Sequence, residues 1–390
     1  MQPKASEKRR PWGCTWRVFL KKPTSGAALK TGGTADAPVP MSAPSSFITG
    51  ISLIRIILCL MICAFHWARW SPVAGSVGVD WFIVLSGFLM TFTLKENSFS
   101  PPSFYIFKFA RLWPLLFTAI LLSSLVSYKE QFQLDNLLGV LLVSFGGNQF
   151  MNLHTGDNYA LWYMKLEILF VLIFPLVAYG RKRLPLLLAL GLVTAVACTF
   201  LEPVARLYFF PPYRLWQFLA GCCAARLYKK HERFFRWSPA VFSFGVLYLL
   251  YQTFIGALWG SGGKVASLAF LLPDTLIAVL TIASACSLAK SPQPPAVKIP
   301  AVLIHLTNRA SLLTYAVFLL HVPLLQFMQY IWPQDRYGTR PILFWICAAL
   351  LLIAVGAAMH YGIEQPCGKW LSSRLKRAFA RVRNIKFTAL

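Results

Sequence analysis

The segment FITGISLIRIILCLMICAFHWA at residues 47–68 decides the fold class. Arg55 is its only Lys, Arg, Asp or Glu, and the segment has the length of about 20 apolar residues that a helix needs to cross a bilayer. Similar apolar runs recur through the chain. The sequence therefore predicts an all-α polytopic membrane protein with about ten transmembrane helices, at 47–68, 77–95, 103–127, 160–180, 184–201, 209–228, 240–258, 268–289, 306–332 and 341–362.

The composition agrees with a membrane protein. Hydrophobic residues make up 57% of the 390 residues and charged residues 13%, whereas a soluble domain carries about 25% charged residues. This composition excludes a soluble enzyme, a disordered protein and a disulfide scaffold. The nine cysteines fall mostly within apolar runs and lack metal-ligand spacing with nearby histidines, so we expect free thiols and no metal site.

Three parts of the chain differ in composition. Residues 1–46 are rich in Pro, Gly, Ser and Ala and predict a disordered, basic cytoplasmic tail. Residues 47–372 form the predicted membrane domain, and 373–390 a basic cytoplasmic segment. A shorter apolar run at 134–147 is too short to span and predicts an interfacial or re-entrant helix.

The net charge of +25 reports topology rather than nucleic-acid binding. With these spans and a cytoplasmic N-terminus, 29 of the 38 Lys and Arg residues lie on the cytoplasmic side and 7 on the outer side. Basic residues accumulate on the cytoplasmic side of membrane proteins, so we expect both termini inside. A basic inner face also attracts anionic membrane lipids.

The first span carries two polar residues on one face. Arg55 and His66 are 11 residues apart, which leaves them about 20° apart around the helix and separates them by about 16 Å along it. Ionisable groups within a span are costly and often functional. The alternative is a snorkelling arginine and a packed histidine.

Four more ionisable residues are expected in the outer half of the bundle, near His66. Asp80 should lie at the depth of His66, where a carboxylate could fix the tautomer of the imidazole; otherwise Asp80 caps its helix. Glu167, Arg214 and His321 are each compatible with a structural role, but together they predict a polar cluster.

Cations are expected at the inner end. Lys108 and Arg111 are three residues apart and share a helix face, and Arg55 points to the same side. Glu364 lies at the end of the last span. Such a cluster suits a phosphate-bearing ligand, although positive-inside topology alone can also explain it.

These residues and their order resemble the membrane acyltransferase-3 family of bacterial O-acyltransferases. The resemblance covers roughly 47–372. It rests on Arg55-x10-His66, on GVDWFIVLSGFL with Asp80 and Ser86, on KFAR with Lys108 and Arg111, on LWYMKLEILF with Trp162 and Glu167, on TYAVFLLHVPLL with His321, and on YGIEQP with Glu364. Lys108 stands where the family has an arginine.

The resemblance implies an enzyme in the bacterial cytoplasmic (inner) membrane. Its donor substrate would be acyl-CoA, most simply acetyl-CoA, and no bound cofactor is expected. The phosphates of the donor would meet Arg55, Lys108 and Arg111. The acceptor would be a hydroxyl of a surface glycan or a lipid-linked saccharide, such as lipopolysaccharide or another polysaccharide.

The resemblance also implies roles in catalysis and acceptor binding. His66 would act as general base on the acceptor hydroxyl, with Asp80 or Glu167 orienting it. A covalent acyl-enzyme through His66 or Ser86 stays open. Residues expected to contact substrate are Ser86, Trp162, Arg214 and His321.

One rival hypothesis belongs to a different class. A transporter or flippase for a glycan or lipid intermediate would also have about ten spans and buried charges. Internal symmetry between the two halves would favour transport, but the sequence shows no convincing repeat. A membrane-bound regulator that keeps the fold without catalysis is a second rival, which the Arg55/His66 pair argues against.

Overall fold

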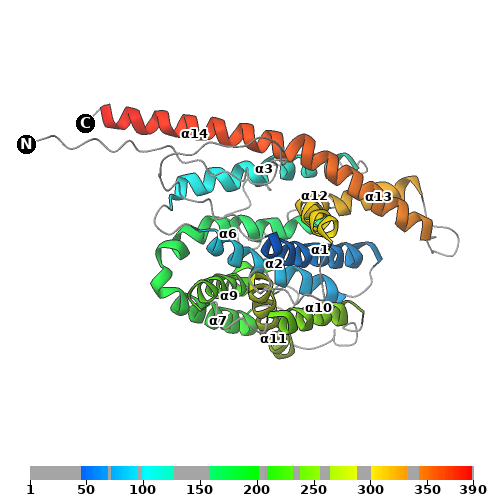
Figure 1. Ribbon diagram of the computed structural model, residues 1–390, viewed down its shortest axis with the longest axis horizontal. Coiled ribbons are helices and arrows are strands. Elements are labelled where there is room, and N and C mark those ends of the chain that lie inside the picture. The colour runs from blue at the N-terminus through cyan, green and yellow to red at the C-terminus, as the bar shows by residue number, and fades with distance from the viewer. Residues whose placement is uncertain are drawn as a thin grey trace, which may run out of the picture. The chain divides into compact units, whose positions relative to one another are not determined.

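The described residues of the computed structural model are 45–68, 72–94, 99–126, 158–201, 207, 209–231, 238–254, 264–287, 300–332 and 342–388. Their secondary structure is helical, and no strand occurs in these ranges. The principal helices, shown in Figure 1, are α1 (Ser45–Ala68), α2 (Pro72–Phe92), α3 (Pro101–Val126), α6 (Trp162–Tyr179), α7 (Leu184–Leu201), α9 (Pro211–Lys230), α10 (Ser238–Phe254), α11 (Lys264–Ser287), α12 (Ala301–Ile331), α13 (Ile342–Met359) and α14 (Gln365–Thr388).

The all-α, polytopic fold class is confirmed, and a helix lies at each of the ten predicted positions. Within the described ranges, seven helices are long and apolar enough to cross a membrane, against about ten predicted for the chain. The apolar parts of α10 and α11 are shorter, at Pro239–Gln252 and Leu271–Cys286. Helix α9 is not among the seven, and its 20 residues include Arg214 and three further basic residues. The predicted helix at 134–147 lies outside the described residues, as do residues 1–44 of the tail predicted at 1–46.

Contacts between helices show the directions in which they run. Asp80 near the start of α2 pairs with Arg214 near the start of α9, and Lys229 near the end of α9 reaches the Thr91 carbonyl near the end of α2. Helices α2 and α9 are therefore parallel. Tyr105 in α3 bonds to Leu172 in α6, and Lys108, further along α3, lies near Glu167, which comes earlier in α6; α3 and α6 are therefore antiparallel.

The same reasoning applies to α1 and α12. Ser311 of α12 bonds to Ser52 of α1. Further along both helices, Trp67 of α1 donates to the carbonyl of His321 of α12. Parallel α1 and α12, like parallel α2 and α9, agree with helices that alternate in direction across a membrane. Which side is cytoplasmic stays a prediction.

Two glycines allow α2 and α9 to touch backbone to backbone. A Cβ on Gly87 would overlap the carbonyl oxygen of Phe218, and a Cβ on Gly221 would overlap that of Val84. Only glycine permits such an approach. Gly87 in the Ser-Gly-Phe sequence at 86–88 is therefore required for packing. The contact also fixes the position of Ser86 along α9.

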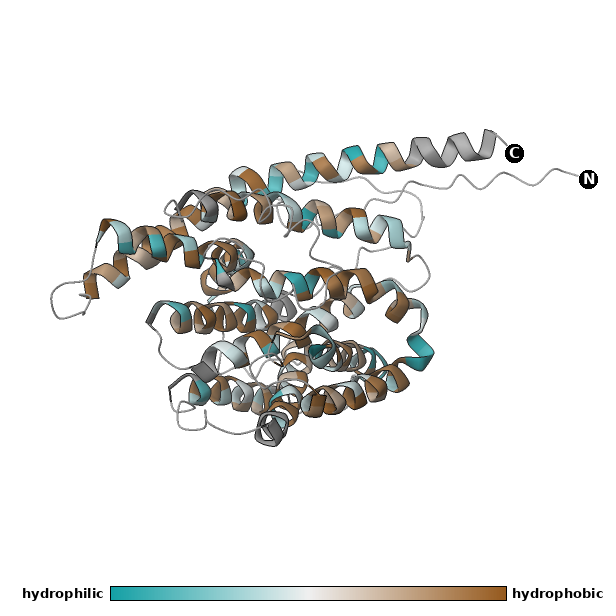
Figure 2. Cartoon of the chain, turned by 180° about the vertical axis from the view of Figure 1, so that it is seen from behind, coloured by the Kyte–Doolittle hydropathy of each residue, from teal (hydrophilic) through white to brown (hydrophobic). Residues whose placement is uncertain are grey.

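Burial separates central from peripheral helices. Within the span on α2, 72% of the residues are buried, compared with 28% on α7 and 22% on the span that begins at Ile342. Figure 2 shows apolar residues along the outer helices, and many of their large apolar side chains are exposed, among them Leu190, Val193 and Leu350. Exposed apolar surface of this extent suits contact with lipid.

The last span continues into a long basic helix. A π-helical turn, η8 (His360–Glu364), joins α13 to α14. Helix α14 packs against α3, where Gly368 approaches the carbonyl of Ala110. The segment from 373, predicted only as a basic cytoplasmic segment, is thus helical through Thr388.

Candidate active site

The interface of α1 and α12 carries a polar group at each end. At one end, Nη2 of Arg55 donates to the hydroxyl of Thr314 at 3.0 Å. At the other, the rings of His66 and His321 lie with their centroids 5.1 Å apart. The two ends are about 16 Å apart along α1. The structure therefore confirms that His66 and His321 are neighbours.

His321 is held in a defined tautomer. Its side chain is fully buried, and its Nδ1 lies 2.6 Å from the carbonyl oxygen of Phe318. A carbonyl only accepts, so Nδ1 carries the hydrogen and Nε2 is left with a lone pair. Nε2 has no hydrogen-bond partner among the described residues. This nitrogen can accept a proton or a hydrogen bond from a ligand.

Glu167 lies in a different group from the histidines. Ser86 donates to its Oε2 at 2.7 Å, and Tyr163 donates to the same oxygen at 3.4 Å. Nζ of Lys108 lies 3.8 Å from Oε1. We expected Glu167 beside His66, but the antiparallel packing of α3 and α6 instead brings it to the cation cluster, where Lys108 balances its charge.

The three predicted donor-binding cations lie in one region. Arg55 and Lys108 are each close enough to Arg111 to be repelled by it, and Glu364 attracts Arg55. Arg55 and Lys108 are partly buried, whereas Arg111 is exposed. Three cations against two carboxylates leave this region with positive charge for an anionic ligand.

Asp80 pairs with Arg214 rather than with His66. The Arg214 Nη1 to Asp80 Oδ1 distance is 2.6 Å, and both side chains are 3% exposed. The same Nη1 donates to Gln217 at 3.2 Å, and Gln217 donates to Thr275. The parallel packing of α2 and α9 makes this pairing. Both residues were predicted in the outer half, but not as partners of each other.

Trp162 lies at the start of α6 and packs edge-on against Phe209, with ring centroids 4.9 Å apart. It is partly buried. Its described contacts place it beside the segment before α9, so its expected role in binding an acceptor stays a prediction.

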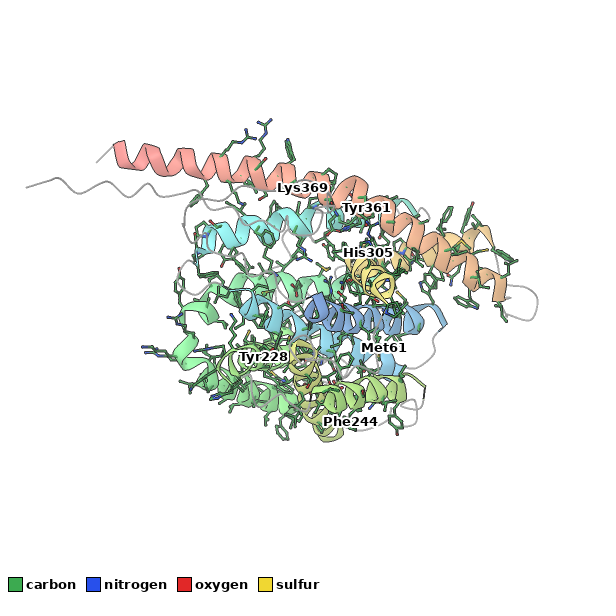
Figure 3. All side chains as sticks on the ribbon, in the orientation of Figure 1. Met61, Tyr228, Phe244, His305, Tyr361 and Lys369 are labelled. Carbon is green, nitrogen blue, oxygen red and sulfur yellow. The ribbon has the colours of Figure 1, made fainter. Side chains whose placement is uncertain are left out.

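Sequence reasoning also missed the pairing of His360 with Glu364. In η8, Nδ1 of His360 lies 2.7 Å from Oε2 of Glu364, and both residues are buried. Figure 3 labels Tyr361, which lies within η8, and Lys369, which lies early in α14. The spacing of four residues between a histidine and a glutamate could have indicated the pair. Within the described ranges, no three His, Cys, Asp or Glu side chains form a group able to hold a metal ion.

Helical spans around an interior with a cationic end and a histidine end are the frame of an integral-membrane protein with a polar interior. Residues 48–361 match the family described as "Acyltransferase domain", which makes the protein an integral-membrane enzyme of the acyltransferase class. The chain belongs to this family, acyltransferase-3.

A characterised protein is similar over part of the chain. Peptidoglycan O-acetyltransferase OatA of Listeria monocytogenes is 29% identical over 232 residues, which is 50% of this chain and 36% of the relative. The match thus spans about a third of the relative's length. No solved structure matches this chain.

Proposed function

We propose that this protein is a membrane O-acyltransferase that moves an acetyl group from acetyl-CoA to a glycan hydroxyl. The observation that carries the proposal is the polar stripe on α1, with Arg55 among cations at one end and His66 beside His321 at the other. A donor serving both ends must keep its phosphates and its acyl group roughly 16 Å apart. Acyl-CoA does so, because its pantetheine arm separates the two.

The reaction divides between the two ends. Phosphate oxygens of the donor bind Arg55, Lys108 and Arg111 through charge-assisted hydrogen bonds. At the other end, His66 takes the proton of the acceptor hydroxyl, and the oxygen attacks the thioester carbonyl. The carbon–sulfur bond breaks, the CoA thiolate takes the proton back from His66, and the acetyl ester remains on the acceptor.

Asp80 and Glu167 act through their partners in this scheme. Glu167 holds Lys108 and Ser86, so it positions a donor-binding cation rather than His66. Asp80 holds Arg214, which leaves the guanidinium fixed at the outer half of α9. His321 lies against His66 and can share its proton or bind the acceptor.

The acceptor follows from the relative. OatA of Listeria is named for peptidoglycan, so peptidoglycan-type hydroxyls are the first acceptors to test. The cation end faces the cytoplasm in this proposal, in keeping with the distribution of basic residues, and the membrane is the bacterial cytoplasmic membrane.

The test is transfer of labelled acetyl from acetyl-CoA in membranes containing the wild-type protein or His66→Gln. We expect label in the glycan fraction only with the wild type. Label that enters the membranes with no transfer to any glycan would favour transport instead. Equal transfer by the two proteins would contradict the role of His66.

A further inference from the structure

Two tryptophans meet at the histidine end of the bundle. Trp67 follows His66 near the end of α1, and Trp345 lies near the start of α13. Both indoles pack against the same small apolar core, which includes the fully buried Phe344. The scheme described above gives neither tryptophan a role, although one of them is the sequence neighbour of the proposed general base.

The position of Trp67 is fixed from two sides. Its Nε1 donates to the backbone carbonyl oxygen of His321 at 2.9 Å. Its ring stacks on that of Trp345, with the centroids 6.4 Å apart and the planes inclined by 28°. Both indoles are only partly buried, so ring surface remains accessible. The result is a fixed pair of aromatic rings that connects α1, α12 and α13 beside the two histidines.

Trp345 lies toward the inward side of α13. The large side chains exposed along this part of the helix belong to Leu343, Ile346 and Leu350, and the buried ones to Phe344, Ala348 and Leu352. At 100° per residue, Trp345 is roughly 60° from the middle of the buried face and roughly 130° from the middle of the exposed face. Tryptophans that anchor a protein in the membrane interface face the lipid headgroups. Trp345 instead faces Trp67 within the bundle.

An indole pair of this kind suits a sugar ring. The face of an aromatic ring carries partial negative charge, and the flat side of a pyranose presents C–H groups, which are weakly positive. Stacking the two removes apolar surface from water and leaves the hydroxyls on the rim of the sugar free. A pyranose stacked here would have those hydroxyls next to the histidine end, where the acceptor hydroxyl is needed.

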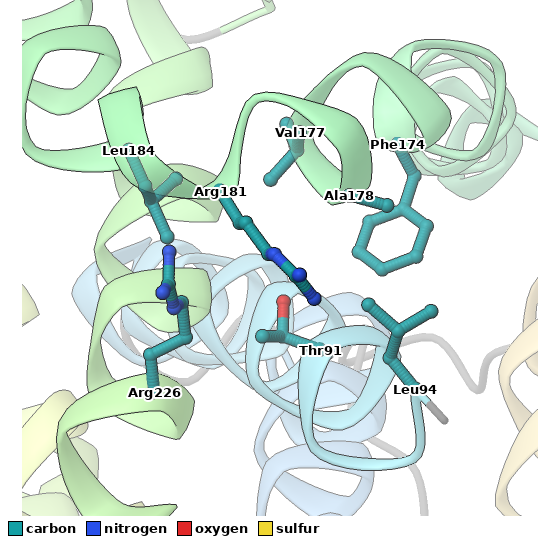
Figure 4. Close-up of a pocket in the computed structure, with 8 residues that line it drawn as sticks. All are labelled: Thr91, Leu94, Phe174, Val177, Ala178, Arg181, Leu184 and Arg226. Atoms are coloured by element: carbon teal, nitrogen blue, oxygen red, sulfur yellow. The ribbon is translucent and has the colours of Figure 1, made fainter. Parts of the chain in front are cut away.

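The recess shown in Figure 4 does not offer an alternative site for a sugar. It is lined by Thr91, Arg181 and Arg226, among others, and its volume is about 10 Å³, room for about one water molecule. Thr91 follows Ser86 on α2 by one to two turns, so the recess lies at the cation end. Its size and its position both separate it from the acceptor.

We propose that Trp67 and Trp345 form an acceptor subsite that stacks on one sugar ring of the glycan. This inference rests on the proposed function, because it identifies where the glycan acceptor binds. Stacking holds the ring beside His66, and a hydroxyl on its rim gives up its proton there. The subsite selects for pyranose rings over small alcohols, since only a ring covers the indole surface.

The experiment measures binding and transfer separately, with the purified full-length protein in nanodiscs. The probe is the soluble β-1,4-linked tetramer of N-acetylglucosamine, and glycerol, which has hydroxyls but no ring, is the comparison acceptor. Trp345→Leu and Trp345→Phe are compared with Trp370→Leu. Trp370 is the matched control, because it is 59% exposed and lies on α14, beyond Glu364 at the cation end. A fluorescence-detected chromatogram confirms that each variant is folded.

Loss of the stacked ring should weaken binding of the tetrasaccharide. For Trp345→Leu we expect its Kd and its KM in transfer to rise roughly three- to tenfold, with kcat, the KM for acetyl-CoA and any transfer to glycerol unchanged. Trp345→Phe keeps a smaller aromatic ring and should give an intermediate loss, so it tests the subsite even if Trp345→Leu does not fold. Trp370→Leu should bind as the wild type does.

Two results would overturn the subsite. One is a folded Trp345 variant that binds the tetrasaccharide as tightly as the wild type, which would leave Trp345 with a packing role only. The other is a wild-type protein that does not bind the tetrasaccharide. The proposed function fails in a different way: a wild-type protein that binds the tetrasaccharide through Trp345 but transfers no acetyl would refute the reaction and leave the sugar subsite standing.

Discussion

The imidazole of His360 binds the carboxylate of Glu364, with 2.7 Å between Nδ1 and Oε2. The amide nitrogen of Gln365 lies 3.0 Å from Nε2 on the other side of the ring. An amide nitrogen donates, so Nε2 accepts and the hydrogen is on Nδ1, where it points to Glu364. A π-helical turn at this place is a frequent mark of a functional site. The pair fixes a carboxylate close to Arg55.

Loss of His360 should weaken binding of the acyl donor. In His360→Ala, the freed Glu364 carboxylate can turn to Arg55 and Arg111 and compete with the phosphates. We expect the KM for acetyl-CoA to rise about tenfold while kcat changes little, as for loss of one charge-assisted contact. Adding Glu364→Gln to the same chain should restore the KM, because the competing charge is gone. A double variant worse than either single variant would show that His360 is only structural.

Replacement of His66 should abolish transfer. His66→Gln keeps hydrogen bonding but cannot take a proton, and loss of a general base costs at least ~10²-fold in rate. His305→Gln on α12 is the matched control, because this histidine is exposed and far along the chain from His321. Both variants should accumulate in membranes to the wild-type level. The measurement is acetyl transfer per unit of inserted protein. Near-normal transfer by His66→Gln would show that another residue is the general base.

Breaking the buried ion pair should destabilise the protein. Arg214→Met leaves the Asp80 carboxylate buried without its partner, which costs about 3–5 kcal/mol. Asp80→Leu combined with Arg214→Met removes both charges and should recover most of the loss. Thermal unfolding in detergent measures the effect. If the double variant were less stable than Arg214→Met, the pair would contribute net stability rather than merely neutralise its members.

A methyl group added at the glycine contact between α2 and α9 should destabilise the protein. In Gly87→Ala the new Cβ would overlap the Phe218 carbonyl, and the two backbones must separate. We expect a loss of about 1–3 kcal/mol from overpacking and a smaller amount of inserted protein. Gly362→Ala is the control, since a Cβ there would meet nothing within 4 Å. Equal thermal stability of the two variants would contradict the close packing.

Both chain termini and the basic segment 181–183 should face the cytoplasm. We fuse a reporter after residue 390 and insert another at 181–183. A reporter that works only in the cytoplasm should be active at both positions, because these segments carry clusters of basic residues. Reporter activity in the periplasm from either position would reverse the proposed orientation, and with it the side from which the donor enters.

The apolar runs predicted the helices well because each span is a local property of about 20 residues. Partners within the bundle were harder to predict. Asp80 and Arg214 are 134 residues apart in sequence, and nothing local to either indicates the other. Glu167 was placed by depth alone, but neighbours depend on which helices touch, and α6 turns Glu167 toward Lys108 on α3. The prediction that Arg55 and His66 share one face did not depend on which helices touch, because both residues belong to one helix. Both side chains contact α12.

The glycine contact between α2 and α9 limits how this protein can move. Two backbones in direct contact leave no side-chain layer in which the helices could slide, so α2 and α9 behave as one rigid body with Asp80, Ser86 and Arg214 attached. The histidines belong to α1 and α12, and Lys108 to α3. Opening and closing around a substrate must therefore take place where these helices meet the rigid pair, and the hydrogen bond from Ser86 to Glu167 crosses that boundary.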